Sequence, residues 1–352
     1  MKLFSPFRVR EIELKNRIVV SPMCEYSAKD GHPQVWHLVH LGSRAIGGAG
    51  LVFTEATAVE ERGRISAADT GIYDDAHVAS WHPIADFIRS HGAVPGMQLA
   101  HAGRKASTAE PWTGGKPVAP HDGGWQPVGP SALAFDAGYT VPRELSRSEI
   151  GEIVEAFRKA AERALAAGFE VLEIHAAHGY LLHQFLSPLT NLRTDEYGGS
   201  FENRFRFAKQ VVGAVRGVLP ERLPLFVRVS ATDWKGGGWD LPQTIELARQ
   251  LKLLGVDLVD VSSGGSVPGV KIPFGPGYQT GFAEAIRKEA GIATGAVGMI
   301  TEPIQAETIL ATEQADLVFL AREMLRDPYW PRRAAKALDV KIEAPVQYQR
   351  AW

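Results

Sequence analysis

The sequence has almost no cysteine, no net charge and no long apolar run. Its 352 residues include one cysteine, Cys24, so neither an internal disulfide nor a zinc site of paired cysteines is possible. The 38 Lys and Arg residues against 40 Asp and Glu residues leave a formal charge of −2, which offers nucleic acid no basic surface. No apolar run of about 18 residues occurs, and the charged N-terminal stretch is unlike a secretory signal. We therefore expect a soluble, cytoplasmic protein with no nucleic-acid or membrane partner.

Several cofactor and catalytic motifs are missing as well. The sequence contains no G-x-G-x-x-G, which excludes the Rossmann fingerprint for a nicotinamide or FAD cofactor. It contains no G-x-x-x-x-G-K-[ST], no H-E-x-x-H and no G-x-S-x-G. A nucleotide cofactor, if the protein has one, must be bound by a different arrangement.

Short runs rich in β-branched residues alternate with longer segments of helical periodicity. Strands are expected at Arg17–Ser21, Leu51–Thr54, Val94–Leu99, Glu170–His175, Leu225–Val229, Leu258–Ser262, Ala293–Val297 and Leu317–Leu320. Helices are expected at Asp75–His91, Ser146–Ala167, Phe201–Val218, Leu241–Leu254, Gly281–Glu289 and Pro303–Thr312. Strands that alternate with helices pair in parallel, so eight such units predict an α/β fold, a (β/α)8 TIM barrel. Length alone suggests two domains, but one barrel accommodates the whole chain.

The helix expected at Ser146–Ala167 carries its own boundary signals. Ser146 and Glu149 have the spacing of a capping box, in which each side chain accepts a hydrogen bond from the other's backbone. Gly168 follows the helix, at the position where glycine adopts the left-handed conformation at little cost.

One segment interrupts the alternation. Glu110–Arg143 is rich in Gly, Pro and Trp and follows the third strand, on the side where barrel enzymes build their active sites. We interpret it as a long loop or lid over that site; a surface excursion without catalytic weight is the alternative.

Polar residues follow several of the expected strands. In a (β/α)8 barrel the carboxyl ends of the strands meet at one mouth, and polar residues there are catalytic more often than structural. The first, third and fourth strands lead into Ser21–Tyr26, Gln98–His101 and His175–Tyr180, and the fifth carries Arg228. We expect these four segments to converge.

The pair His175 and His178 is the strongest catalytic candidate. Two imidazoles three residues apart can donate hydrogen bonds to one developing oxyanion. A metal pair, with His183 as the nearest further ligand, and packed core histidines are the alternatives. Tyr180 has an ordinary pKa near 10, so it is a proton donor at neutral pH. A second H-x-x-H, His37 and His40, lies in a helical stretch, and we interpret it as helix surface or packing.

Arg228 and Gln98 suit a flavin ring. A permanent cation inside a barrel mouth is costly unless it meets an anion, and a flavin that becomes anionic on reduction is one such partner. An amide such as Gln98 both donates and accepts, which matches the edge of a flavin pyrimidine. Cys24 taken alone is more often a small buried hydrophobic residue than a functional thiol.

The loops after the last two strands resemble a phosphate site. Barrels hold phosphates there, where glycines allow backbone N–H groups to approach an anion and an arginine can clamp it. Gly298 and Arg322 occupy these two positions. A turn glycine and a surface ion pair are the alternatives.

Long stretches of the sequence match one known family. They include KNRIVVSPMCEYSA, GMQLAHAGRKA, GFEVLEIHAAHGYLLHQFLSPLTNLRTDEYGGSFENR, LFVRVSATD, ATGAVGMIT, ADLVFLAREMLRDP and APVQYQRAW, and they cover nearly the whole chain. The sequence resembles the old yellow enzyme family of FMN-dependent ene-reductases, and within it the bacterial NADPH dehydrogenase and xenobiotic reductase branch. The resemblance implies non-covalent FMN, NADPH as hydride donor, and reduction of the activated C=C bond of α,β-unsaturated carbonyl and nitro compounds.

The resemblance also implies roles for individual residues. His175 and His178 hold the substrate oxygen, Tyr180 protonates the α-carbon, Tyr26 contacts the substrate, and Cys24 tunes the flavin potential. The residues expected to bind FMN are Ser21, Pro22, Met23, Cys24, Ala56, Gln98, Arg228, Gly298, Met299, Ala321 and Arg322, with Ser263 as a further candidate.

The C-terminal tail, residues 339–352, is expected to serve a neighbouring subunit. By resemblance, Arg350 enters that neighbour's active site and binds substrate there, in a homodimer or homotetramer. Two departures from the family, the long loop Glu110–Gly129 and Val297 in place of a tryptophan, bear on the substrate range.

Two rival functions remain from the residues alone. One is a flavin-free, phosphate-binding barrel lyase or aldolase that works through a lysine Schiff base; Lys105 is the lysine nearest a strand end, although it lies past the strand. The other is a non-catalytic FMN-binding protein. In neither rival does NADPH reduce a bound flavin, which distinguishes both from the ene-reductase.

Overall fold

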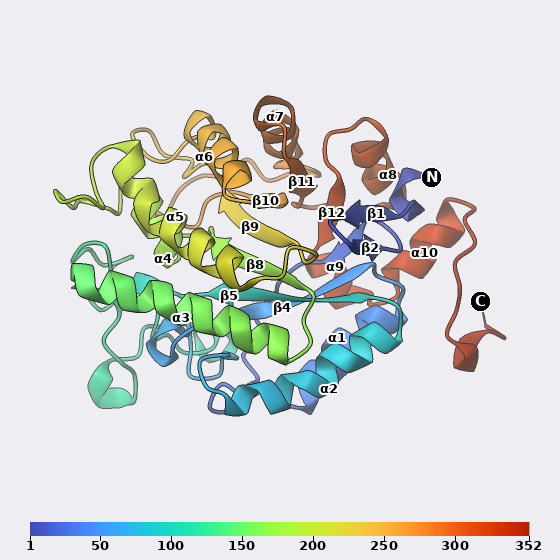
Figure 1. The fold of residues 1–352 in the computed structure, drawn as a ribbon, viewed down its shortest axis with the longest axis horizontal. Helices are drawn as coiled ribbons and strands as arrows, with labels where there is room; N and C mark the ends of the chain where they lie inside the picture. Colours follow the sequence, from blue (N-terminus) through green and yellow to red (C-terminus); the bar gives the residue numbers. More distant parts are fainter. Residues whose placement is uncertain (352) are drawn as a thin grey trace.

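A computed structural model describes residues 1–351 and contains a closed barrel of eight parallel strands (Figure 1). Around the barrel their order is β10, β11, β12, β3, β4, β5, β8 and β9. Their bounds are β3 Ile18–Val20, β4 Leu51–Ala58, β5 Val94–Ala100, β8 Val171–Ala176, β9 Leu225–Ser230, β10 Leu258–Ser262, β11 Ala293–Ala296 and β12 Leu317–Leu320. The predicted (β/α)8 barrel is confirmed, and all eight predicted strands are present.

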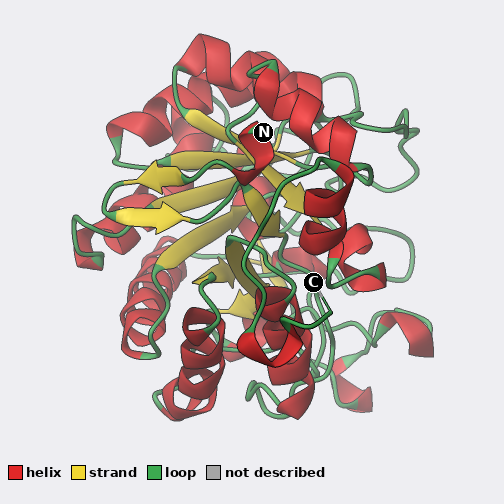
Figure 2. Ribbon diagram, turned by 90° about the vertical axis from the view of Figure 1, so that its right-hand side faces the viewer, coloured by secondary structure: helices red, strands yellow, loops and turns green. Residues whose placement is uncertain are grey.

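Helices ring the barrel (Figure 2). The main ones are α1 Val35–Ile46, α2 Ala76–Ser90, α3 Arg147–Ala166, α5 Phe201–Val218, α6 Leu241–Leu253, α7 Thr280–Ala290 and α8 Pro303–Ala311. The six predicted helices agree with these within one or two residues. Three more were not predicted: α4 Leu181–Leu186, α9 Arg322–Arg326 and α10 Trp330–Ala337.

The boundary signals of α3 act as predicted. Ser146 Oγ accepts a hydrogen bond from Glu149 N at 3.3 Å, and Glu149 Oε2 accepts one from Ser146 N at 3.0 Å. Gly168, just beyond the helix, has φ +93°. The capping box and the glycine stop are therefore confirmed.

Three phenylalanines fill the lower part of the barrel. Phe53 lies 6.1 Å from Phe226 and 6.2 Å from Phe319, measured between ring centroids. Gly96 and Gly295 make room for them, since a Cβ on either glycine would approach a phenylalanine ring within 2.7 Å or 2.2 Å, respectively. This apolar floor leaves the polar inward-facing side chains above it, at the carboxyl ends of the strands.

The N-terminal end of the barrel is covered by the start of the chain. Strands β1 (Phe7–Val9) and β2 (Ile12–Leu14) form an antiparallel hairpin, and its turn residue Arg10 pairs with Asp257 at 2.7 Å. Asp257 immediately precedes β10, so the hairpin lies at the end opposite the expected active site.

The segment Glu110–Arg143 lies over loops near the mouth. Trp125 Nε1 donates to Arg62 O at 2.9 Å, and Arg104 donates to the carbonyl oxygens of Leu133 and Ala134. At the far end of the segment, β6 (Val128–Gly129) pairs with β7 (Arg143–Glu144). The segment is therefore packed and hydrogen-bonded, while its role as a lid stays a prediction.

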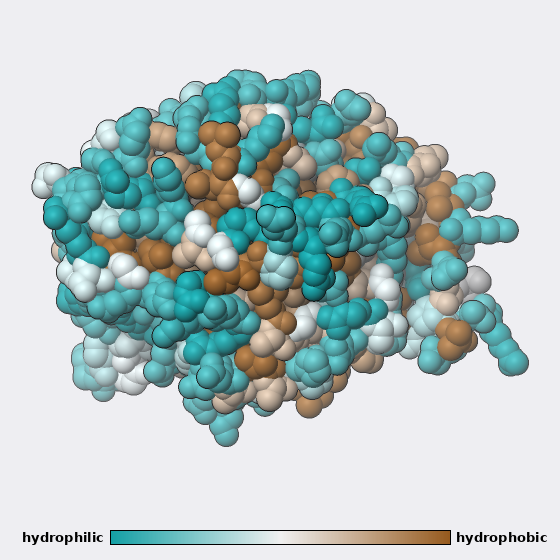
Figure 3. All heavy atoms as spheres, viewed as in Figure 1, coloured by the Kyte–Doolittle hydropathy of each residue, from teal (hydrophilic) through white to brown (hydrophobic). Residues whose placement is uncertain are grey.

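Hydrophilic side chains cover most of the face seen in Figure 3, with smaller hydrophobic patches among them. Within residues 1–351, none of the helices is both long and apolar enough to cross a membrane.

Candidate active site

The barrel brings the predicted polar segments together. Register pairs Ala56 with Gln98 across β4 and β5, and pairs His175 with Arg228 across β8 and β9. Since β3, β4, β5, β8 and β9 are consecutive around the barrel, their carboxyl ends form one continuous wall of the mouth. The predicted convergence of these segments is confirmed.

His175 is a neutral imidazole that donates from Nε2. Its Nδ1 accepts a hydrogen bond from the backbone N–H of Ala177 at 3.3 Å, which leaves the proton on Nε2. Burial and, next, the positive charge of Arg228 lower the pKa of His175 well below its ordinary value. A neutral imidazole with a fixed Nε2–H is a hydrogen-bond donor throughout the physiological range of pH.

His178 and Tyr180 lie beside His175. The ring of His175 is 5.1 Å from that of His178 and 5.0 Å from that of Tyr180, edge to face in both cases. Burial and Arg228 also lower the pKa of His178, and burial raises the pKa of Tyr180 well above its ordinary value. Within residues 1–351, no three His, Cys, Asp or Glu side chains group as metal ligands. The trio therefore offers two imidazoles and a protonated phenol.

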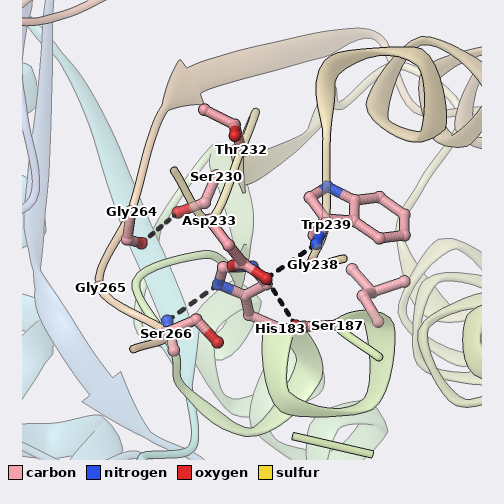
Figure 4. A network of polar contacts seen from close by, with 12 residues as sticks. His183, Ser187, Ser230, Thr232, Asp233, Gly238, Trp239, Gly264, Gly265 and Ser266 are labelled. Atoms are coloured by element: carbon pink, nitrogen blue, oxygen red, sulfur yellow. Dashed lines mark hydrogen bonds and ion pairs between the residues drawn. The ribbon is translucent and has the colours of Figure 1, made fainter. Parts of the chain in front are cut away.

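The turn that carries His178 is held by the loops after β9 and β10. His178 has φ +57°, its backbone N–H donates to Ser230 Oγ at 2.9 Å, and its Nε2 lies 2.8 Å from Ser262 Oγ. Ser230 Oγ in turn donates to Gly264 O at 2.9 Å (Figure 4). The contact with Ser262 fixes the orientation of the His178 ring.

A buried network anchors the same turn from below (Figure 4). Gly179 N donates to His183 Nδ1 at 2.9 Å, and His183 Nε2 lies 3.0 Å from Asp233 Oδ1. Asp233 Oδ2 accepts from Ser187 Oγ at 2.6 Å and from Trp239 N at 2.8 Å. Burial opposes the charge on Asp233, but these partners outweigh it and lower the pKa of Asp233. His183, weighed in the sequence as a third metal ligand, is instead a support for the turn.

Two buried carboxylates that the sequence did not identify lie below the mouth. Arg228 Nε is 3.0 Å from Asp260 Oδ2, and Gln98 Nε2 donates to Glu173 Oε1 at 2.8 Å. Burial raises the pKa of Asp260 to about 6, and burial together with Asp260 raises the pKa of Glu173 well above its ordinary value. Arg228 thus already has an anionic partner. The sequence did contain a signal for Glu173. Side chains alternate along β8, so Glu173, two residues before His175, faces the same side of the strand as His175.

The segment after β3 presents a thiol and a tyrosine. Cys24 is half-buried, and burial, Asp69 and Glu55 raise the pKa of its thiol well above the ordinary value, so it stays protonated. Tyr26 has φ +44° and its ring lies 5.9 Å from that of Trp112, in the long loop. Ser21 Oγ is buried and finds no hydrogen-bond partner within residues 1–351.

The second H-x-x-H is internal. His37 is 2% exposed and its Nε2 lies 2.9 Å from Glu55 Oε1, while His40 Nε2 lies 3.3 Å from Glu25 Oε1. The surface alternative is therefore wrong and the packing alternative is confirmed. These histidines attach α1 to the segments after β3 and within β4.

Lys105 lies closer to the mouth than its sequence position suggests. Its Nζ donates to His178 O at 2.9 Å and Gly265 O at 3.1 Å, and it lies over the rings of Tyr180 and Phe135 at 5.0 Å and 4.6 Å. Burial and Arg104 lower the pKa of Lys105 to about 8. The ammonium group thus connects the turn at His178 to the loop at Gly265 and contacts the two aromatic rings.

The two predicted parts of the phosphate site line one cavity. It has a volume of about 270 Å³ and its lining includes Ser262, Tyr278, Gln279, Gly298, Met299, Ala321, Arg322 and Arg326. Gly298 has φ +123°, and a Cβ there would meet Gln279 Nε2 at 2.8 Å. Ser263, the further candidate, donates to Gln279 Oε1 at 2.5 Å, and Ser262 rather than Ser263 lines the cavity.

The C-terminal tail lies elsewhere. Residues 341–347 line a cavity with Lys15 and Asn16, which precede β3 at the N-terminal end of the barrel. Arg350 is exposed and follows this stretch by three residues, a reach of about 11 Å, so it does not join the mouth of its own chain. Trp352 lies outside the described residues.

Comparisons with known proteins show the family of this chain. Residues 2–341 match the sequence profile of the NADH:flavin oxidoreductase / NADH oxidase family. The chain is 52% identical to an NADPH dehydrogenase of Bacillus licheniformis over 353 residues, 100% of this chain and 99% of that protein. It is 49% identical to an NADPH dehydrogenase of Bacillus subtilis, with the same coverage.

Solved structures with the same fold include morphinone reductase bound to tetrahydroNAD, with a TM-score of 0.79 and 29% identity over 97% of this chain and 92% of that one. The old yellow enzyme homologue from Zymomonas mobilis gives a TM-score of 0.81 and 29% identity, covering 99% of this chain and 96% of that one.

Proposed function

Because this chain belongs to the NADH:flavin oxidoreductase / NADH oxidase family, we propose that it is an FMN-dependent ene-reductase. NADPH is the reductant, and the substrates are α,β-unsaturated carbonyl compounds and nitro compounds. The resemblance to old yellow enzymes is confirmed by the family profile and the neighbouring structures. The observation that carries the proposed reaction is the placement of His175, His178 and Tyr180 around one point of the mouth.

The residues present fit FMN. The cavity lined by Gly298 and Arg322 suits a phosphate, because a glycine leaves its backbone close to the space and an arginine supplies charge. The unpartnered hydroxyl of Ser21 and the amide of Gln98 offer polar contacts for the ring. Bound FMN would supply hydride chemistry, accepting a hydride from NADPH and giving one to the substrate. The remaining contacts are proposed for Pro22, Met23, Cys24, Ala56, Arg228, Met299 and Ala321.

His175 and His178 are proposed to hold the substrate oxygen. Burial favours the neutral form of both imidazoles. The free proton of His175 is on Nε2, because its Nδ1 accepts from Ala177 N. Two fixed donors stabilise the negative charge that develops on a carbonyl or nitro oxygen, and one such donor is worth about 10²–10³ in rate. Tyr26, at the edge of the mouth, would contact the rest of the substrate.

Tyr180 is proposed to protonate the substrate α-carbon. Its raised pKa keeps the phenol protonated until the substrate takes the proton. Lys105 and the ring of His175 hold the phenol ring from two sides, so the hydroxyl has a fixed direction. Cys24 would tune the flavin potential as a neutral thiol, which spectroelectrochemistry on Cys24→Ala would test.

NADPH and the substrate are proposed to use the same mouth in turn, which gives ping-pong kinetics. The loop 110–143 would act as its lid, since Trp112 already contacts Tyr26. The tail, residues 339–352, would place Arg350 in the mouth of a neighbouring subunit of a homodimer or homotetramer.

Anaerobic titration tests the proposed function. We expect the purified protein to absorb near 450 nm, to lose that absorbance with NADPH, and to regain it with 2-cyclohexenone, N-ethylmaleimide or a nitroalkene. A colourless protein that takes up no FMN would refute the proposal. A yellow protein that NADPH does not reduce would instead be the non-catalytic FMN-binding alternative.

A further inference from the structure

A small cavity is lined by Tyr180 and by residues of β4 and β5. Its volume is about 10 Å³, which is room for about one water molecule. The lining side chains that carry a polar group are Asp69 and Tyr180. The rest of the lining is apolar and consists of Ala56, Ala58, Gly63, Ile65, Ala100 and Ala102.

Asp69, which lines this cavity, has a carboxyl oxygen without a hydrogen-bond partner. The residue is 1% exposed and closes a turn with Ser66, after β4. Its Oδ2 accepts a hydrogen bond from Ile65 N at 2.6 Å, whereas residues 1–351 provide no partner for its Oδ1. A buried carboxyl oxygen without a partner costs about 1–3 kcal/mol, so a water that bridges it to Tyr180 is favoured.

The surroundings of Asp69 favour its protonated form. Burial and then the carboxylate of Glu55 raise the pKa of Asp69 well above its ordinary value, against hydrogen bonds from the backbone of Ile65 and Ser66. Arg64 is the cation that acts on it, and its guanidinium is also bound to Glu61 at 3.2 Å. The neighbouring Cys24, Tyr26 and Tyr180 are all neutral acids with raised pKa values.

We propose that Asp69 is a positioning residue that restores the proton of Tyr180 through one water in this cavity. The inference rests on the proposed function, in which Tyr180 protonates the substrate. A substrate in the mouth covers the phenol from the front, so bulk water cannot reach it at the moment it loses its proton. A water in the cavity, next to Asp69, can donate a proton to the phenol while the substrate is bound.

The protons balance as follows. The O–H bond of Tyr180 breaks as the Cα–H bond of the product forms. The cavity water passes a proton to the Tyr180 oxygen, and Asp69 passes its own proton to that water. After the product leaves, solvent returns one proton to Asp69, so each turnover takes up one solvent proton and no electrons pass through these groups.

Two half-reactions measured by stopped flow in the FMN-loaded protein test the relay. Asp69→Asn keeps the shape but cannot give up a proton, so we expect reoxidation by 2-cyclohexenone to slow at least about tenfold, within the range of general-acid effects. Flavin reduction by NADPH should change less than about twofold. In the Tyr180→Phe background Asp69→Asn should slow reoxidation no further, because both substitutions interrupt the same proton pathway.

Infrared spectroscopy provides a readout that does not depend on turnover. Because Glu173 is a second buried carboxyl with a raised pKa, the readout is a difference spectrum. We expect the wild type minus Asp69→Asn to show the C=O band of one protonated buried carboxyl, and the wild type minus Asp74→Asn, an exposed carboxyl five residues along the chain, to lack it. If Asp69→Asn does not fold, Ala102→Val fills the cavity instead and should slow reoxidation while the band persists.

The outcomes separate the relay from the proposed function. Reoxidation of either cavity variant at the wild-type rate, or a difference spectrum between the wild type and Asp69→Asn without the carboxyl band, overturns the relay and leaves the ene-reductase proposal intact. A wild type that no enone or nitro compound reoxidises overturns the proposed function, whereas the infrared result still reports on the proton of Asp69.

Discussion

The substitution Gly179→Ala tests whether the turn after β8 sets the geometry of catalysis. Gly179 lies between His178 and Tyr180, has φ +73°, and packs against the loop after β10. A Cβ at this position would lie 2.2 Å from Gly265 O and 2.7 Å from Ser266 Cα. An added methyl group must therefore push the turn away from that loop.

The structure gives the size of the effect. An ordinary contact needs about 3.2–3.4 Å, so the turn must move by roughly 1 Å, and a displacement of that size costs about 100-fold in rate at a reacting centre. The left-handed conformation adds about 1–2 kcal/mol of strain for alanine. Because His178 and Tyr180 move with the turn, the loss should fall on transfer to the substrate rather than on FMN binding.

Gly199→Ala is the matched control. Gly199 has φ +82°, but a Cβ there would meet no atom within 4 Å. The left-handed conformation should cost each variant about 1–2 kcal/mol in urea unfolding, and the clash should add to that loss in Gly179→Ala. Only Gly179→Ala should slow reoxidation by 2-cyclohexenone about 100-fold. If the two variants reoxidise within twofold of each other at equal FMN content, the reasoning is refuted.

Three further changes have expected outcomes. Tyr180→Phe should slow reoxidation by an enone about 10²–10⁴-fold and leave flavin reduction by NADPH unchanged in stopped flow; equal losses in both would contradict its role as proton donor. Glu173→Met removes the acceptor that holds Gln98 and should weaken FMN binding about 5–10-fold in a fluorescence titration, whereas Glu173→Gln keeps an acceptor and should bind as the wild type does. Burial opposes the charge on Glu60, but hydrogen bonds and charges from His101 and Arg62 lower the pKa of Glu60 to about 2. The ionised Glu60 therefore stabilises the folded state above its unfolded pKa of about 4.5, and this contribution is lost as the pH falls toward 2. In Glu60→Gln the free energy of unfolding in urea should therefore depend less on pH between pH 4.5 and 2. The same pH dependence as in the wild type would argue against the interaction of Glu60 with His101 and Arg62.

The sequence by itself determined the architecture. Strand and helix periodicities are local patterns, so seven of the eight barrel strands and six of the helices were predicted nearly to the residue, as were the capping box at Ser146 and the stop at Gly168. The H-x-x-H-x-Y segment after the fourth strand pointed to the mouth for the same reason, because the position of a residue after a strand fixes its end of the barrel. The exception is β4, which was predicted at Leu51–Thr54 and extends to Ala58 in the structure.

Only the tertiary structure decided which buried groups meet. Glu55 stays within β4 because His37 on α1 pairs with it, and Gln98 meets Glu173 across two strands that are 75 positions apart in the sequence. The cavity lined by Asp69 and Tyr180 also joins residues that are far apart in the sequence. Closure of the barrel sets these contacts, and closure depends on strand order and register, which no local pattern encodes. Cys24 illustrates both: the sequence places it directly after a strand, whereas its raised pKa comes from its burial and from the carboxylates that the fold brings close to it.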